Sequence, residues 1–146
     1  MQDCRRILDS AFKDCGLLSI PKLPKGVYYL GRRSFHHCRE IRWDTLPSGM
    51  TTIAGEAFEF CSSLALTTLP KTLLYIGWQA FRHCSNLKIA RIELSINAEV
   101  ALTAFEECPR AVRCAHERWR SPEEDSPACS IQASFDALQL EDANNP

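Results

Sequence analysis

Ala57-Phe58-x-x-Cys61 is one of five copies of a short phrase, a small residue followed by Phe-x-x-Cys, that recurs along this chain. The other copies are Ala11-Phe12-x-x-Cys15, Ser34-Phe35-x-x-Cys38, Ala80-Phe81-x-x-Cys84 and Ala104-Phe105-x-x-Cys108. Successive Phe residues lie 23, 23, 23 and 24 positions apart. A fixed period of roughly 20 to 50 residues indicates the stacked coils of a solenoid. The chain is therefore expected to carry its function on surfaces rather than in a pocket.

The residues between these phrases fall into columns when they are counted from each Phe. Apolar residues recur six, eight, eleven, fifteen and eighteen positions after it, and Pro recurs twelve positions after it in three copies. In the copy that begins at Phe35, these residues are Ile41, Trp43, Leu46, Met50, Ile53 and Pro47. In the fourth copy, the fifteen-position column holds Ile96, and one extra residue moves the last column to Val100.

Each column predicts a piece of local structure. Apolar residues two apart, at positions six and eight, predict a short strand with one inward face. Pro cannot donate to a strand ladder, so it ends this strand, and a second short strand is expected at positions fifteen to eighteen. Gly31 and Gly77 are expected to permit a tight bend, and the Phe-x-x-Cys phrase to form about one helical turn.

The consensus Pro-x-x-(Leu/Met)-x-x-Ile-x-x-x-Ala-Phe-x-x-Cys-x-x-Leu resembles the BspA-like, or treponemal-type, leucine-rich repeat. Its best copies run from Pro47 to Leu64 and from Pro70 to Leu87, and the resemblance covers residues 7–112. It implies a right-handed superhelix of coils of about 23 residues, each with short β-strands and a short helical turn. It also implies a non-catalytic scaffold for protein–protein interaction.

The pattern divides the chain of 146 residues into three parts. Residues 1–112 are expected to form the solenoid, with an incomplete first coil, and residues 113–120 a capping helix. Residues 121–146 contain six acids and no base, against a formal net charge of -1 for the whole chain, and are expected to be a largely disordered acidic tail. No signal peptide or membrane span is recognised, which favours an intracellular, cytoplasmic location.

The eight cysteines and four histidines do not predict a site of thiol or metal chemistry. Five of the cysteines belong to one structural column, and none forms a Cys-x-x-Cys pair. His37 and His83 are two coils apart, about 9.6 Å, which is too far for one ion. Cys114 near His116 lacks an orienting third group, so no catalytic residue, metal site or cofactor is expected.

The cysteine spacing and the distribution of basic residues bear on the disulfide state and on nucleic-acid binding. Stacked column cysteines are close enough for disulfides, but buried free thiols are favoured for an intracellular chain. The basic residues near the N-terminus are interrupted by acids and belong to different columns, so a nucleic-acid partner is not expected.

The function is therefore expected to lie on the outer surface of the solenoid. The predicted protein-binding residues form a first-strand face, made of Arg42, Asp44, Thr67, Lys88 and Arg91, together with Tyr28 and Tyr75 on the second strand. The expected partner is another protein, and self-association through the open solenoid ends is also left open. Two alternative functions stay open as well: a fragment of a larger cell-surface or adhesion protein, and a thiol- or zinc-dependent protein.

Overall fold

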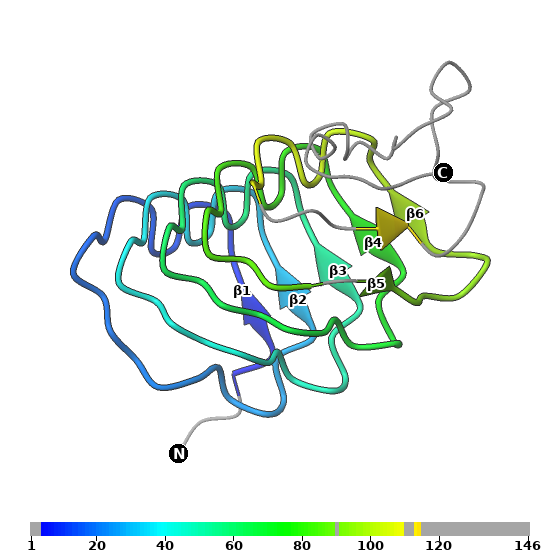
Figure 1. The fold of residues 1–146 in the computed structure, drawn as a ribbon. Helices are drawn as coiled ribbons and strands as arrows, with labels where there is room; N and C mark the ends of the chain where they lie inside the picture. Colours follow the sequence, from blue (N-terminus) through cyan, green and yellow to red (C-terminus); the bar gives the residue numbers. More distant parts are fainter. Residues whose placement is uncertain (1–3, 90, 110–112, 115–146) are drawn as a thin grey trace.

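The computed structural model describes residues 4–89, 91–109 and 113–114, and in this part of the chain successive coils stack side by side into a solenoid (Figure 1). Five two-residue strands, one from each successive coil, form a parallel sheet: β1 (Arg6–Ile7), β2 (Tyr29–Leu30), β3 (Thr52–Ile53), β4 (Tyr75–Ile76) and β6 (Glu99–Val100). Their register repeats the sequence period of 23, since Arg6 pairs with Tyr29, Tyr29 with Thr52 and Thr52 with Tyr75. Glu99 then follows Tyr75 by 24.

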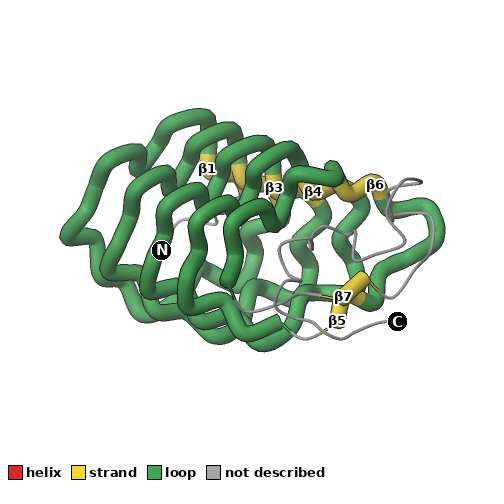
Figure 2. Tube along the Cα trace, turned by 45° about the horizontal axis from the view of Figure 1, so that its top comes forward, coloured by secondary structure: helices red, strands yellow, loops and turns green. Residues whose placement is uncertain are grey.

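A second, two-stranded parallel sheet consists of β5 (Arg91–Ile92) and β7 (Arg113–Cys114), across the coils from the first (Figure 2). This is the side on which a strand is expected six to eight residues after each Phe. The residues predicted to face inward there are buried from the second coil onward and partly buried in the first coil, but the earlier coils form no strand on this side, so the predicted first strand is only partly correct. On this side, few backbone hydrogen bonds join the coils; in one of them, Ala65 N–H donates to the Trp43 carbonyl at 3.0 Å.

The capping helix predicted for residues 113–120 is wrong at its first two positions. Arg113 and Cys114 are extended and pair with β5, because the edge of that strand offers backbone groups that an incoming strand can satisfy. Residues 115–120 and the acidic tail of 121–146 lie outside the described residues. The described residues include no helix with the length and apolarity needed to cross a bilayer.

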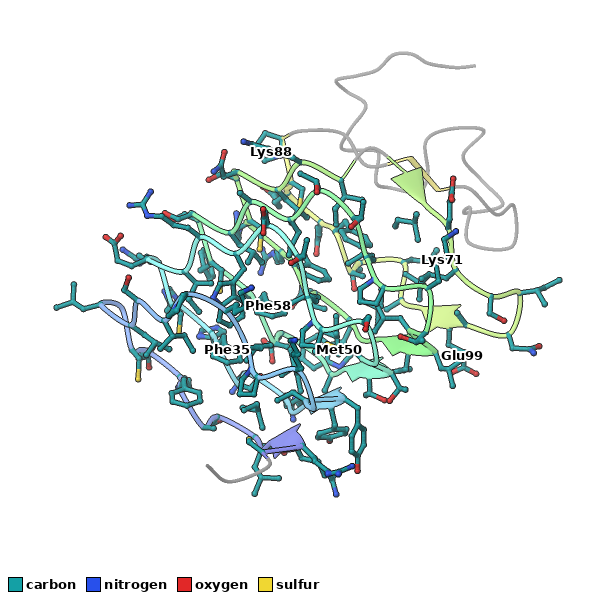
Figure 3. All side chains as sticks on the ribbon, turned by 90° about the horizontal axis from the view of Figure 1, so that it is seen from below. Phe35, Met50, Phe58, Lys71, Lys88 and Glu99 are labelled. Carbon is teal, nitrogen blue, oxygen red and sulfur yellow. The ribbon has the colours of Figure 1, made fainter. Side chains whose placement is uncertain are left out.

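A ladder of parallel Phe rings runs through the core. The centroid distances are 5.2 Å for Phe12–Phe35, 5.6 Å for Phe35–Phe58, 5.4 Å for Phe58–Phe81 and 5.1 Å for Phe81–Phe105, with interplanar angles of 15° or less. Phe35 and Phe58 lie inside the coils with Met50, whereas Lys88 is at the periphery (Figure 3). The predicted Phe column is therefore the centre of the core.

The predicted helical turn at the Phe-x-x-Cys phrase is absent. The phrase instead forms consecutive turns, and in the first four copies the residues two before and two after the Phe are left-handed, for example Arg33 (φ 56°) and His37 (φ 64°) around Phe35. Alternate N–H groups then donate to the next coil, as His37 N–H does to the Glu59 carbonyl at 2.9 Å. An α-helical turn would direct these donors along its own chain and leave the coils unjoined here. These consecutive turns form what we term the turn ridge.

The glycines that follow strands β2, β3 and β4 serve close packing rather than a bend. No described glycine has a positive φ, so the conformational reason expected from the sequence is wrong. A Cβ on Gly77 would lie 2.5 Å from the Gly55 nitrogen, and one on Gly31 would lie 2.6 Å from the Asp9 nitrogen. These positions lack a side chain because the neighbouring backbone occupies its place.

The extra residue of the fourth copy changes which side chain faces inward. Ile96, the residue predicted for the inward column, is 63% exposed, whereas Ala98 is fully buried. The turn that replaces the Pro turn of the other copies is closed by a bond of 2.9 Å from Ala98 N–H to the Ser95 carbonyl. The additional length thus moves the turn along the chain and brings Ala98 into the core.

Phe58→Ala should lower the free energy of unfolding by about 3–5 kcal/mol, because the ring is fully buried between two stacked neighbours. Phe12→Ala is the matched control, since this ring is only partly buried and has one neighbour in the stack. Urea denaturation followed by circular dichroism measures both. Equal losses for the two variants would contradict the central role of the ladder.

Gly77→Ala should destabilise the protein by about 1–3 kcal/mol, because the added methyl group meets the backbone of the preceding coil. Gly49→Ala should have little effect, since nothing lies within 4 Å of a Cβ at that position. Thermal unfolding of the two variants compares them directly, and a similar shift for both would show that coil spacing is not limiting at Gly77.

Candidate functional site

The first-strand face predicted from sequence is exposed at four of its five residues. Arg42, Asp44, Thr67 and Lys88 are exposed, and the side chain of Arg91 lies outside the described residues. Thr67 N–H donates to the Asp44 carbonyl at 3.2 Å, which places these two residues side by side on neighbouring coils. The Arg42 guanidinium is paired with Glu40 at 3.0 Å within its own coil. The face is thus a polar surface whose charges are partly engaged.

Tyr28 and Tyr75 belong to a different surface. Tyr75 is part of β4 and Tyr28 directly precedes β2, so both lie on the side of the five-stranded sheet, whereas the first-strand face lies on the side of β5 and β7, with the coils between the two sides (Figure 2). The structure therefore does not bring the seven predicted binding residues together, and they form two separate candidate surfaces.

The tyrosine face, which we define as Tyr28, Tyr29, Thr52, Leu74 and Tyr75, lies at and beside strands β2 to β4. Tyr28 is 39% exposed, Leu74 51% and Tyr75 38%, while Tyr29 is half-buried beneath the Arg6 guanidinium at 4.3 Å from its ring centroid. Backbone bonds link its coils, including Leu74 N–H to the Thr51 carbonyl at 2.8 Å. Large side chains of mixed apolar and polar character are therefore held outward by a rigid sheet.

The turn ridge carries a buried ionic cluster that the sequence reasoning missed. Glu56 and Glu59 are 7% and 4% exposed, and Arg33 binds Glu56 with contacts of 2.7 and 3.3 Å. Burial opposes ionisation of Glu56, but the hydrogen bond and charge of Arg33 bring its pKa below the ordinary value. Burial and the nearby Glu56 carboxylate raise the pKa of Glu59, which contacts Arg82 at 3.4 Å.

His36 lies between carboxylates of the coils before and after its own. Its Nδ1 atom is 3.9 Å from Asp14 Oδ1, and its Nε2 atom is 3.9 Å from Glu59 Oε1. Burial and the adjacent His37 lower the pKa of His36. The signal that could have found this cluster is the column one residue after each Phe, which combines His36, Glu59 and Arg82 on successive coils.

A second aromatic stack follows the turn ridge, one residue further along. The rings of His37, Phe60 and His83 stack with centroid distances of 4.5 Å at each step. This places His37 and His83 on either side of Phe60, so they do not meet at one ion, as the sequence spacing predicts. The stack is half-buried.

Four of the five cysteines in the column, all but the exposed Cys15, are buried, and the thiols of the column are free. Sγ of Cys38, Cys61, Cys84 and Cys108 donates to the carbonyl of the Phe in the preceding coil at 3.0–3.1 Å. Burial raises the pKa of Cys38 to about 11 and that of Cys108 to about 12, and it raises the pKa of Cys61 and Cys84 as well. Because the thiolate is the nucleophile, these cysteines are chemically inert.

Iodoacetamide at pH 8 should modify the exposed Cys15 in the folded protein and leave Cys38, Cys61, Cys84 and Cys108 unmodified, since their thiols are buried and protonated. Mass spectrometry of peptides before and after unfolding in guanidinium measures this difference. Modification of Cys61 or Cys84 at the rate of Cys15 would contradict the assignment of these thiols to the core.

A solenoid of short parallel strands with a repeated apolar column defines the class of leucine-rich-repeat proteins. The chain belongs to the BspA type leucine rich repeat family, whose repeat matches residues 3–112 in six copies. No curated protein and no solved structure matches the chain. Proteins with leucine-rich repeats generally mediate protein interactions, and the BspA type is generally non-catalytic.

Proposed function

We propose that this protein is a non-catalytic scaffold that binds a protein partner through the tyrosine face. The observation that carries the proposal is the exposure of Tyr28, Leu74 and Tyr75, at 39%, 51% and 38%, along one sheet, where the coil of β3 lies between the coil of Tyr28 and the coil of Leu74 and Tyr75. Interfaces between proteins are enriched in tyrosine and depleted in lysine and acidic residues. The tyrosine face has this composition, and the first-strand face does not.

Rigidity supports the same surface. Strands β2, β3 and β4 are joined in register, and the backbone beneath the tyrosine face is bonded from coil to coil. A partner that docks here would meet side chains whose backbone is already ordered, which reduces the entropy lost on association. Tyr is suited to such a face because it supplies a large contact area with only two side-chain torsions.

The remaining chemistry of the described residues supports a binding role rather than catalysis. The buried thiols are protonated and inert, and the Glu56 carboxylate is bound by Arg33. Catalysis of group transfer would require a nucleophile next to a general base, together with hydrogen-bond donors that stabilise the charge of the transition state. The tyrosine face has no such group.

Replacement of Tyr28 and Tyr75 together by Ser should abolish capture of the partner in a pull-down from the native cell extract. The matched control is the double variant Arg42→Glu, Lys88→Glu, which changes the opposite face and should retain the same partner. Quantitative mass spectrometry compares both variants with the wild type, and thermal unfolding establishes that both are folded.

The outcomes of this experiment separate the two surfaces. Loss of the partner only in the Arg42→Glu, Lys88→Glu variant would assign binding to the first-strand face and contradict our proposal. Equal retention by both variants would exclude both faces.

A further inference from the structure

We propose that Asp14, His36 and His37 form a binding site for a divalent transition metal of the zinc class. One potential ligand atom from each of the three side chains lies within 4.8 Å of the others. Two imidazoles and a carboxylate are a common protein donor set for Zn²⁺, which leaves the fourth position to water. The sequence reasoning missed this set because it compared histidines along one column, whereas the donors come from two columns and two coils.

The unpaired Nδ1 atom of His36 supports the binding of a metal ion at this point. Its Nδ1 atom is buried and has no hydrogen-bond partner among the described residues, although it faces Asp14 Oδ1 at 3.9 Å. Buried polar atoms normally have a partner, so an orphaned nitrogen indicates a group that the protein alone does not supply. Two ligand atoms bound at ~2.1 Å to a tetrahedral Zn²⁺ lie about 3.4 Å apart. A shift of the exposed Asp14 side chain closes this difference.

Glu59 provides the outer support that metal-binding histidines usually have. Its Oε1 atom is buried without a hydrogen-bond partner in the described part of the chain, and it lies 3.9 Å from His36 Nε2. A histidine that binds a metal through one nitrogen commonly donates its other N–H to a carboxylate, which fixes the ring. Metal at Nδ1 and Glu59 at Nε2 would together satisfy both orphaned atoms.

The backbone around the site is fixed before any ion arrives. Asp14 N–H donates to the His36 carbonyl at 2.7 Å, and His37 N–H donates to the Glu59 carbonyl at 2.9 Å. These bonds tie the three consecutive coils that carry the donors and the supporting carboxylate.

Two exposed cations adjoin the site and set a limit on its affinity. Lys13 Nζ lies 3.5 Å from Asp14 Oδ2, and an Arg39 guanidinium nitrogen lies 3.2 Å from His37 Nδ1. Both side chains are long and can move into solvent, whereas the buried Glu56 is already bound by Arg33 and is not counted among the donors. Removal of either exposed cation should favour binding of the metal.

The test is calorimetric titration of the full chain with ZnCl₂ at pH 7.5, after dialysis against EDTA. We expect one strong site per chain. His36→Ala and Asp14→Asn should each weaken it at least tenfold, and Glu59→Gln should weaken it by about tenfold through loss of the supporting carboxylate. His83→Ala is the matched control, because His83 stacks on Phe60 just as His37 does but has no place in the donor set.

Substitution by Co²⁺ identifies the ligands independently. The proposal predicts d–d bands without the near-ultraviolet absorption of a cobalt–thiolate bond, which Cys4 or Cys15 would produce. Asp14 is exposed, so Asp14→Asn tests the site even if His36→Ala disturbs folding. Absence of zinc binding, unchanged affinity in Asp14→Asn, or a thiolate band would each overturn the proposal. Failure here leaves the role of the tyrosine face untouched.

Discussion

Each coil of this protein depends on its neighbour for a place to bury its aromatic ring. A single coil of 23 residues has too little apolar surface to fold alone, because its Phe would contact water on both faces. Stacking at 5.1–5.6 Å covers each interior ring with the next, and buried Leu, Ile and Cys residues belong to the same core. The arrangement of the sheet, the turn ridge and the outer faces depends on this stacking contact.

The turn ridge shows how the backbone is satisfied without regular secondary structure. Left-handed residues such as Glu56 and Phe60 aim alternate N–H groups at the next coil, while the cysteine thiols bond the Phe carbonyls. Non-glycine residues in this conformation cost about 1–2 kcal/mol each, and the inter-coil hydrogen bonds and Phe stacking offset that cost. The same geometry brings ionisable side chains of three coils together around His36, so this ridge carries the densest cluster of ionisable groups that we describe in the molecule.

The sequence predicted the stacking well because the period and the inward columns depend only on spacing. It could not predict the turn geometry, since Arg33 and His37 are left-handed without being glycine and nothing in their identity signals it. Gly77 was predicted to permit a tight bend, although its real constraint is the backbone of a neighbouring coil that is distant in sequence. Ala98 rather than Ile96 is the buried residue, because the spacing reveals that the copy has an extra residue but not where the chain accommodates it. The outward position of Tyr28 and Tyr75 was correctly predicted, whereas the cluster at His36 required the register of adjacent coils.

That single additional residue, placed between β5 and β6, shows where the molecule accepts a change of length. The turn at Ser95 and Ala98 moves to absorb it, and the strand register resumes at Glu99. The ridge has no comparable slack, since every second N–H there must meet a particular carbonyl of the next coil. Gene duplication could therefore lengthen such a protein by whole units of 23 residues, whereas small insertions would accumulate only in the loop opposite the ridge.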